Sequence, residues 1–251
     1  MLRHLLLGIS RLHGCGIAHT DIQPDSIMIA LGRNWTRDAL ENWVRENPPR
    51  TYAPERSLKK MVSPFVSQSL PPPTFDVLSS CNFKLADFGN AQFVSDKTTD
   101  DAIIIPLELQ APEIVLGGEW NESIDIWTFG CLIFTLLTNR TLFKPMKLPE
   151  QDASEVDVLL YQMISFTGEF FKADFLQRCE RSVDYFRPDC HLQKFQRYGR
   201  KEFEKCIPDS GCVLSPEDMA GVSDLMTKCL RIDPKDRTTA VDLLRHPWLA
   251  Q

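Results

Sequence analysis

The sequence predicts a mainly α-helical domain of the α+β class with a few short β-strands. Three observations support this fold class. Apolar residues recur at helical spacing in several long segments. Only two short apolar runs, residues 27–29 and 83–85, are typical of strands. A long polar stretch rich in proline, residues 31–80, separates these two runs.

The chain opens with a predicted amphipathic helix. Its apolar residues fall at i, i+3, i+4, i+7 and i+10, which is one face of a helix. Gly14 and Gly16 are expected to end it, because glycine readily adopts the conformations found after a helix C-terminus. The apolar positions are Leu2, Leu5, Leu6, Ile9 and Leu12.

Residues 31–80 are interpreted as an insert within a single domain that covers residues 1–251. The insert contains many prolines, with serine and basic residues between them. This composition predicts a largely irregular or disordered segment, with one short helix around Trp35–Val44.

The most apolar segment follows Asn121, which is predicted to be the N-cap of a long helix. The helix is apolar nearly all round, so it belongs in the middle of a core. Its apolar stripe is Ile124, Trp127, Cys131, Phe134 and Leu137.

Further helices are predicted over residues 154–177 and 216–230. A last short helix follows Thr239, whose pairing with Asp242 resembles a capping box. The polar segment 178–215 gives no clear prediction.

Charge and cysteine content restrict the classes of function. The chain of 251 residues has a net charge of −6, which argues against a nucleic-acid platform and favours a basic partner. Its eight cysteines form no C-x-x-C pair, so they are interpreted as reduced thiols of an intracellular protein, cytoplasmic or nuclear. No apolar run approaches the roughly 20 residues that span a bilayer, so no membrane association is expected. We expect a monomer.

Two segments contain acidic residues that could face a substrate or a cation. Segment 19–26, His-Thr-Asp-Ile-Gln-Pro-Asp-Ser, lies between the first helix and the strand at 27–29. Its Asp21 is predicted at a turn, facing solvent or substrate. Asp87-Phe88-Gly89 directly follows the strand at 83–85, and its aspartate can face a cation. Taken alone, each motif is weak, because an Asp-Phe-Gly tripeptide is usually only a turn.

Two further motifs make chance an unlikely explanation. Ala111-Pro112-Glu113 precedes Asp125-Ile126-Trp127, which opens the apolar helix, and residues 233–237, Asp-Pro-Lys-Asp-Arg, precede the last helix. In this order and spacing, the sequence resembles the eukaryotic protein kinases over essentially the whole chain apart from the insert. The resemblance implies a protein-kinase-like fold, here its mainly helical C-terminal lobe, with the N-terminal β lobe absent.

Within that superfamily the chain is most similar to the kinases of serine/arginine-rich splicing factors. Thr20 replaces the usual arginine between His19 and Asp21, Asn90 follows the Asp-Phe-Gly motif, and a long polar insert separates the two loops. The resemblance implies transfer of the γ-phosphate of ATP to Ser or Thr of a protein substrate, which is expected to be rich in Arg and Ser.

The resemblance also implies the roles of the site residues. Asp21 would accept or orient the proton of the substrate hydroxyl, and Gln23 occupies the position of a lysine that contacts the transferred phosphate. Asp87 would ligate Mg²⁺ bound to ATP, and Ser26 occupies the position of an asparagine that ligates a second metal ion. Four other residues are expected to be structural. The resemblance implies that Glu113 and Arg237 form a buried ion pair, that Asp125 holds the backbone of the catalytic loop, and that His19 serves packing and hydrogen bonding.

The sequence departs from the family pattern at several points. It contains no Gly-rich loop, no strand lysine for the phosphates and no helix glutamate to position that lysine. Gln23 cannot neutralise charge, and Ser26 has a shorter reach than asparagine. Thr20 removes the arginine that pairs with a phosphorylated activation loop in many kinases, so we expect no control by such a phosphate.

Three functions therefore remain open. The first is a serine/threonine protein kinase that is truncated and inactive or weak as this chain. The second is a pseudokinase that acts as a binding scaffold. The third, a small-molecule phosphotransferase, leaves Ala111-Pro112-Glu113 unexplained and ranks last.

The acidic stretch 150–157 also has two readings. Its carboxylates Glu150, Asp152, Glu155 and Asp157 would either dock Arg-rich peptides or form a solvated helix N-terminus that the helix dipole favours.

Overall fold

The computed structural model describes residues 1–30, 35–66, 68–71, 81–96 and 105–250. The chain divides into two compact units. The first unit comprises Met1–Met28 and Lys84–Gln251, and the second comprises Ile29–Phe83.

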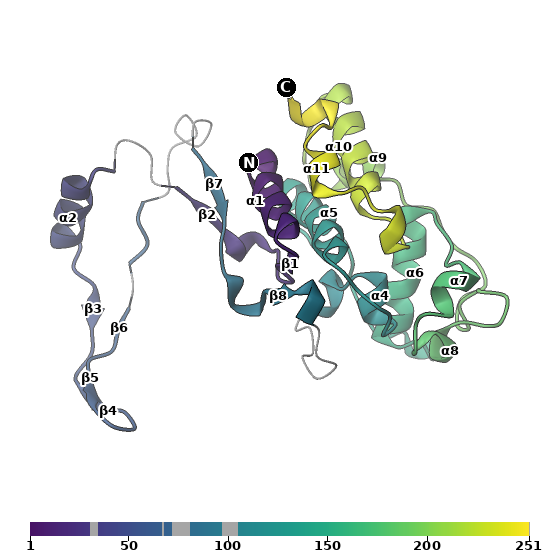
Figure 1. Cartoon of the computed structure of the whole chain (residues 1–251), viewed down its shortest axis with the longest axis horizontal. Helices are drawn as coiled ribbons and strands as arrows, with labels where there is room; N and C mark the ends of the chain where they lie inside the picture. The colour runs from purple at the N-terminus through teal and green to yellow at the C-terminus, as the bar shows by residue number, and fades with distance from the viewer. Residues whose placement is uncertain (31–34, 67, 72–80, 97–104, 251) are drawn as a thin grey trace. The chain divides into compact units, whose positions relative to one another are not determined.

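The described residues are mainly helical (Figure 1). The α-helices are α1 Leu2–Gly14, α2 Arg37–Glu46, α4 Pro112–Val115, α5 Ser123–Thr138, α6 Glu155–Thr167, α7 Ala173–Leu176, α8 Ser182–Tyr185, α9 Phe203–Cys206, α10 Pro216–Cys229 and α11 Ala240–Leu243. The strands are β1 Ile17–Ala18, β2 Ile27–Ile29, β3 Arg50–Thr51, β4 Glu55–Arg56, β5 Met61–Val62, β6 Phe65–Val66, β7 Phe83–Leu85 and β8 Gln92–Phe93. Short 3₁₀ turns include η1 Pro24–Ser26, η2 Phe88–Asn90 and η7 Pro234–Asp236.

Helix α5 forms the centre of the first unit, because 12 of its 16 residues are buried. Trp127 stacks on Phe143 with ring centroids 5.5 Å apart, and Phe143 meets Phe166 edge to face at 5.8 Å. Burying an aromatic side chain of this size contributes about 1.5–3 kcal/mol. The prediction of a central apolar helix is therefore confirmed.

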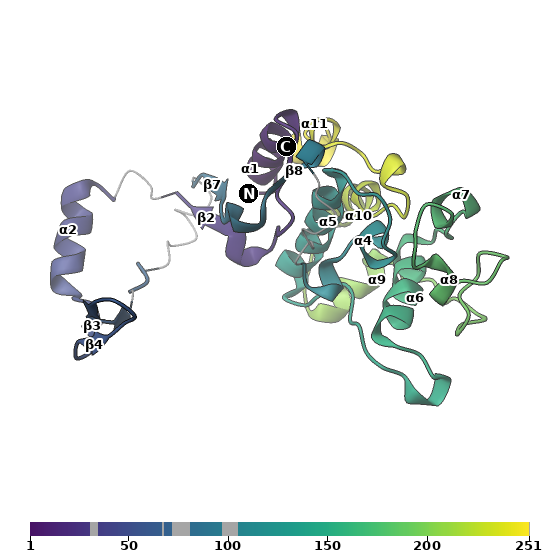
Figure 2. The same cartoon turned by 60° about the horizontal axis from the view of Figure 1, so that its bottom comes forward.

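Helices α1, α5, α10 and α11 lie side by side in both views (Figures 1 and 2), with α10 against α5 and α11 against α1. Gly130 allows the close approach of α10. A Cβ atom at this position would lie 2.8 Å from Cγ of Leu230. No helix in the described ranges has both the length and the apolar character needed to cross a bilayer.

One predicted helix boundary is wrong. The helix expected over 154–177 ends at Thr167, because Gly168 adopts a left-handed conformation, with φ of 68°, that caps it. The separate helix α7 follows. At the start of α5, Oδ1 of Asn121 accepts a hydrogen bond from the backbone N–H of Ser123 at 2.9 Å, so Asn121 supplies the predicted capping bond one residue before Glu122.

The short strands pair locally. β1 pairs with β8 in antiparallel register, Ile17 opposite Phe93, and β2 pairs with β7. The strands at 27–29 and 83–85 lie where the sequence predicts them. They flank the two segments that carry the acidic motifs.

The second unit contains a helix and a two-stranded ribbon. α2 overlaps the predicted helix at Trp35–Val44 and is capped by the hydroxyl of Thr36. Strands β3 and β6 pair, as do β4 and β5, although the sequence was predicted to be largely irregular here. Among the described residues of this unit only Cys81 is buried, so the unit has no apolar core of its own.

Candidate active site

The backbone of segment 19–26 is supported from below by Asp125, which is fully buried in the first turn of α5. Its Oδ1 accepts a hydrogen bond from the N–H of Thr20 at 2.8 Å, and its Oδ2 accepts one from the N–H of His19 at 2.8 Å. His13 Nε2 lies 2.9 Å from the same Oδ2. These bonds hold Thr20 at φ of 67°, a conformation that is strained for a β-branched residue.

His19 packs against the second loop. Its Nδ1 accepts a hydrogen bond from the N–H of Asp21 at 3.3 Å, so Nε2 carries the proton and donates to the carbonyl of Ala86 at 2.9 Å. Its ring centroid lies 5.1 Å from that of Phe88. The side chain is fully buried, and both ring nitrogens are used within the chain.

The Asp21 carboxylate is bonded on one side only. Asn90 Nδ2 donates to Asp21 Oδ2 at 3.2 Å. Asp21 Oδ1 is shielded from solvent and has no hydrogen-bond partner in the described parts of the chain. A buried carboxylate oxygen without a donor is costly, so this atom would gain from a ligand that donates a hydrogen bond.

Ser26 is enclosed within its own turn. The side chain is 1% exposed, its hydroxyl donates to the carbonyl of Gln23 at 2.7 Å, and its oxygen accepts from the N–H of Gln23 at 3.0 Å. Reaching a metal ion would require this turn to open. Gln23 itself is half-buried at the start of η1.

Asp87 is exposed and has a left-handed backbone, with φ of 63° and ψ of 67°. Aspartate tolerates this region better than most residues. Its Oδ1 lies 3.5 Å from where a Cβ of residue 89 would be, which is an ordinary van der Waals contact.

Hydrogen bonds join the two acidic loops. Besides the bonds of His19 and Asn90, the N–H of Ala86 donates to the carbonyl of Ser26 at 2.8 Å, and the Thr20 hydroxyl donates to the carbonyl of Asn90 at 2.8 Å. The loops that carry Asp21 and Asp87 are thus fastened together on both sides of the Asp-Phe-Gly motif. This arrangement brings together two loops that lie far apart in the sequence.

The donor set suits a hard cation that also binds phosphate. Nowhere in the described ranges do three His, Cys, Asp or Glu side chains converge on one point. Mg²⁺ commonly takes only one or two carboxylates and completes its shell with phosphate oxygens and water. The exposed Asp87 carboxylate fits such an ion, whereas the enclosed Ser26 hydroxyl does not fit without rearrangement.

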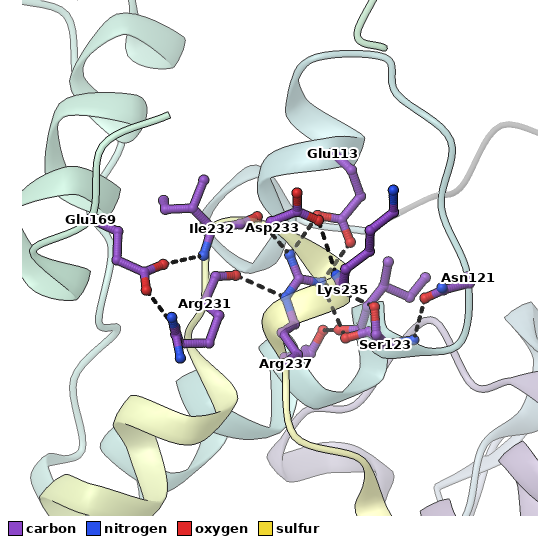
Figure 3. A network of polar contacts seen from close by, with 11 residues as sticks. Glu113, Asn121, Ser123, Glu169, Arg231, Ile232, Asp233, Lys235 and Arg237 are labelled. Carbon is purple, nitrogen blue, oxygen red and sulfur yellow. Dashed lines mark hydrogen bonds and ion pairs between the residues drawn. The ribbon is translucent and has the colours of Figure 1, made fainter. Parts of the chain in front are cut away.

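Glu113 and Arg237 form a buried bidentate pair (Figure 3). Both guanidinium NH groups donate to the two carboxylate oxygens at 2.6 Å. Arg237 Nε donates to the carbonyl of Arg231 at 3.0 Å, and Nη1 also donates to the carbonyl of Ser123 at 3.2 Å. The guanidinium carbon lies 5.3 Å from the ring centroid of Trp127. The pair ties α4 to the segment before α11 and to α5.

The acidic stretch 150–157 is partly used inside the fold. Asp157 is buried and forms a capping box with Ser154 at the start of α6. Asp152 pairs with Lys194, and this hydrogen bond lowers the pKa of Asp152. Of the four carboxylates, Glu150 and Glu155 are the ones that remain exposed without a recorded ion pair in the described ranges.

Three of the buried cysteines have thiols that stay protonated. All eight are free, and Cys131 and Cys229 lie in the core, where burial raises the pKa of each thiol. Burial, with a smaller contribution from Glu113, raises the pKa of Cys179 to about 11. A thiolate nucleophile is therefore not favoured at these three positions.

Two residues at the site were not predicted to act there. His13 lies within the periodic pattern of α1, and nothing local indicates that it reaches Asp125. Asn90 was noted only as part of the resemblance, and its contact with Asp21 spans 69 positions of sequence.

Comparisons with known proteins agree with the motifs. Residues 75–249 match the protein kinase domain. The chain is 26% identical to the serine/threonine-protein kinase SRPK of Physarum polycephalum, over all of this chain and 60% of that protein. It is 27% identical to the dual specificity protein kinase lkh1 of Schizosaccharomyces pombe, over 99% of this chain and 31% of that protein. A mouse protein, mitogen-activated protein kinase 13, is 28% identical over 73% of this chain and 44% of its own length.

The chain spans less than two thirds of the length of each of these relatives. The match to the protein kinase domain nevertheless covers most of the chain, and it includes Asp87, Glu113, Asp125 and Arg237. By this match, and with SRPK among its relatives, the chain belongs to the eukaryotic protein kinase family.

Proposed function

We propose that this chain is the part of a serine/threonine protein kinase that binds the protein substrate and carries the catalytic carboxylates. The observation that carries the proposal is the joining of the Asp21 and Asp87 loops, with Asp21 Oδ1 left without a donor. A carboxylate in this state is suited to receive a hydrogen bond from an incoming hydroxyl.

In the proposed reaction the hydroxyl oxygen of a Ser or Thr attacks the γ-phosphorus of ATP. The bond from that phosphorus to the bridging oxygen breaks, ADP leaves, and the hydroxyl proton passes to the Asp21 carboxylate. Asp87 would hold the magnesium ion of the nucleotide, which supplies charge that stabilises the phosphate oxygens. Asp125 keeps Asp21 in place by fixing the backbone just before it.

Position 23 offers an amide where the family has a cation, and the Ser26 hydroxyl is bonded within its turn. Both features reduce the electrostatic stabilisation that phosphoryl transfer needs. These features support weak or absent activity of the isolated chain. They also favour the second candidate, a pseudokinase whose helical surface binds a partner without transfer.

The proposed substrate is a protein segment rich in Arg and Ser. The similarity to SRPK and the exposed carboxylates of Glu150 and Glu155 support this class, although Asp152 and Asp157 are used within the fold. We propose a monomer in the cytoplasm or nucleus that binds neither nucleic acid nor membrane.

A phosphorylation assay tests the proposal. Residues 1–251 alone, with radiolabelled ATP, Mg²⁺ and an Arg/Ser peptide, are expected to give no measurable transfer. Turnover by this chain that Asp21→Ala abolishes would contradict the expected inactivity and support catalysis.

The coding sequence upstream of Met1 distinguishes the kinase hypothesis from the pseudokinase hypothesis. A Gly-rich loop followed by a Val-Ala-x-Lys strand supports the kinase. If the form carrying that region transfers no phosphate, and Asp21→Asn leaves its partner binding unchanged, the pseudokinase is supported.

A further inference from the structure

Two hydrogen bonds converge on Asn90, the residue that follows Asp-Phe-Gly. Its backbone carbonyl accepts from the Thr20 hydroxyl at 2.8 Å, and its side-chain Nδ2 donates to Asp21 Oδ2 at 3.2 Å. We infer that Asn90 is a positioning residue for the Asp21 carboxylate, and that the Thr20 hydroxyl holds Asn90 in place. The role in catalysis rests on the proposed function, but the contact itself does not.

The support for Asn90 begins in the core. Asp125 binds the backbone N–H of Thr20, which is 1% exposed. A β-branched side chain has few χ1 states, and the positive φ of Thr20 restricts the direction in which it leaves the backbone. The hydroxyl is therefore a rigid donor that connects α5 to the loop after Asp87.

The orientation of the Asn90 amide follows from charge. The NH₂ group faces the carboxylate, because a carboxamide oxygen in its place would repel Asp21. A hydrogen bond to an ionised acceptor is stronger than one between neutral groups. The bond from Asn90 fixes the position of Asp21 Oδ2, so the other oxygen, Asp21 Oδ1, also keeps a single orientation.

The family resemblance places an asparagine that ligates a metal ion at position 26, where this chain has serine. In this chain the Ser26 hydroxyl is bonded to Gln23, and the carboxamide beside Asp21 comes from the second loop. Thr20 and Asn90, two departures from the common pattern, thus act as one unit.

NMR of residues 1–251 at constant pH tests the contact without catalysis. We expect the bond to Asp21 to slow the exchange of the Asn90 side-chain NH₂ protons with solvent. This protection should be lost in Asp21→Ala and retained in Asp87→Asn. Protection that survives Asp21→Ala, or disappears in Asp87→Asn, overturns the inference.

Two further variants test the link to Thr20. Thr20→Val keeps the branched shape but removes the hydroxyl, so the protection of the Asn90 NH₂ protons should decrease, and Thr20→Ser should restore it. Gln92→Ala, which removes an amide two residues further along, should leave the protection unchanged. Undiminished protection in Thr20→Val would show that Asn90 is held without Thr20.

If a form of the protein that includes a Gly-rich loop and a strand lysine transfers no phosphate, while the Asn90 NH₂ protons stay protected, the proposed function fails and this contact stands. If that form transfers phosphate and the protection is absent, the contact fails alone. The two proposals therefore fail separately.

Discussion

Glu113 and Asp21 are both carboxylates on segments fixed by α5, but their surroundings differ. Glu113 is buried, and each of its oxygens accepts from Arg237 at 2.6 Å. Asp21 has one oxygen bonded to an exposed amide and the other bonded to nothing in the described ranges. The fold fully satisfies the carboxylate that supports it and leaves one oxygen of the carboxylate at the site without a donor. Substitutions at the buried Glu113–Arg237 pair should therefore mainly reduce stability, whereas substitutions at the site should mainly reduce binding.

The largest loss of stability is expected for Arg237→Met. The variant leaves Glu113 buried without its cation, which typically costs about 3–5 kcal/mol. Urea unfolding followed by circular dichroism measures the change. Arg245→Met is the control, since its pair with Asp242 is exposed and should contribute nothing measurable. Equal midpoints for the two variants would mean that the buried pair is not a main support.

A smaller loss is expected for Asp125→Asn. The new NH₂ group of asparagine replaces a carboxylate oxygen that now accepts a hydrogen bond, so at least one donor beside residue 125 loses its acceptor. The expected loss of stability is about 1.5–3 kcal/mol. Amide hydrogen exchange at His19 and Thr20 should become faster, while exchange in α10 follows only the global change. Unchanged exchange at those two amides would show that Asp125 does not hold the loop.

A still smaller effect, dependent on pH, is expected at Asp224. Hydrogen bonds from Lys228, and then from His246 Nε2 at 2.8 Å, lower the pKa of Asp224 in the folded state. A depressed pKa stabilises the fold above the unfolded value, about 3.9, and this contribution is lost as pH falls through the folded value. Asp224→Asn should therefore destabilise the chain at pH 7 and much less at the acid end. A difference from wild type that stays constant with pH would contradict this assignment.

The smallest change in stability is expected for Asp87→Asn, because asparagine also tolerates the left-handed backbone at φ of 63°. Binding should respond instead. Loss of the proposed ligand Asp87 should lower the affinity for Mg²⁺–nucleotide by at least about tenfold. Mutating residues that only orient metal ligands already lowers metal affinity or activity about 10–100-fold. Calorimetry, or Mn²⁺-induced line broadening if affinity is low, measures it. Asp25→Asn, an exposed carboxylate in the first loop, is the control. Equal broadening in both variants would remove Asp87 from the proposed metal site.

Local sequence patterns were sufficient for several elements. The periodicity of residues 124–137 predicts the buried helix α5, and the two apolar runs predict β2 and β7. The helix expected over 154–177 is wrong because Gly168 ends α6, and the ribbon of the insert was missed because its strands are only two residues long. Periodicity needs several turns or alternations to be informative.

The roles within the acidic stretch 150–157 could not be decided from its composition. Ser154 three residues before Asp157 fits a capping box, and the structure shows that bond. Nothing in the sequence indicates that Asp152 pairs with Lys194, 42 positions away. Whether a carboxylate is free for a partner depends on which side chains the fold brings to it.

The sequence by itself determined the order of the acidic and structural motifs, the apolar central helix and the family. The resemblance also predicted the ion pair of Glu113 with Arg237, which the structure shows. Only the tertiary structure decided that His13 reaches Asp125 and that Asn90 holds Asp21. The reason is physical. Helical and strand periods follow from each residue's local backbone geometry, whereas a hydrogen bond between distant side chains exists only once packing has fixed both ends.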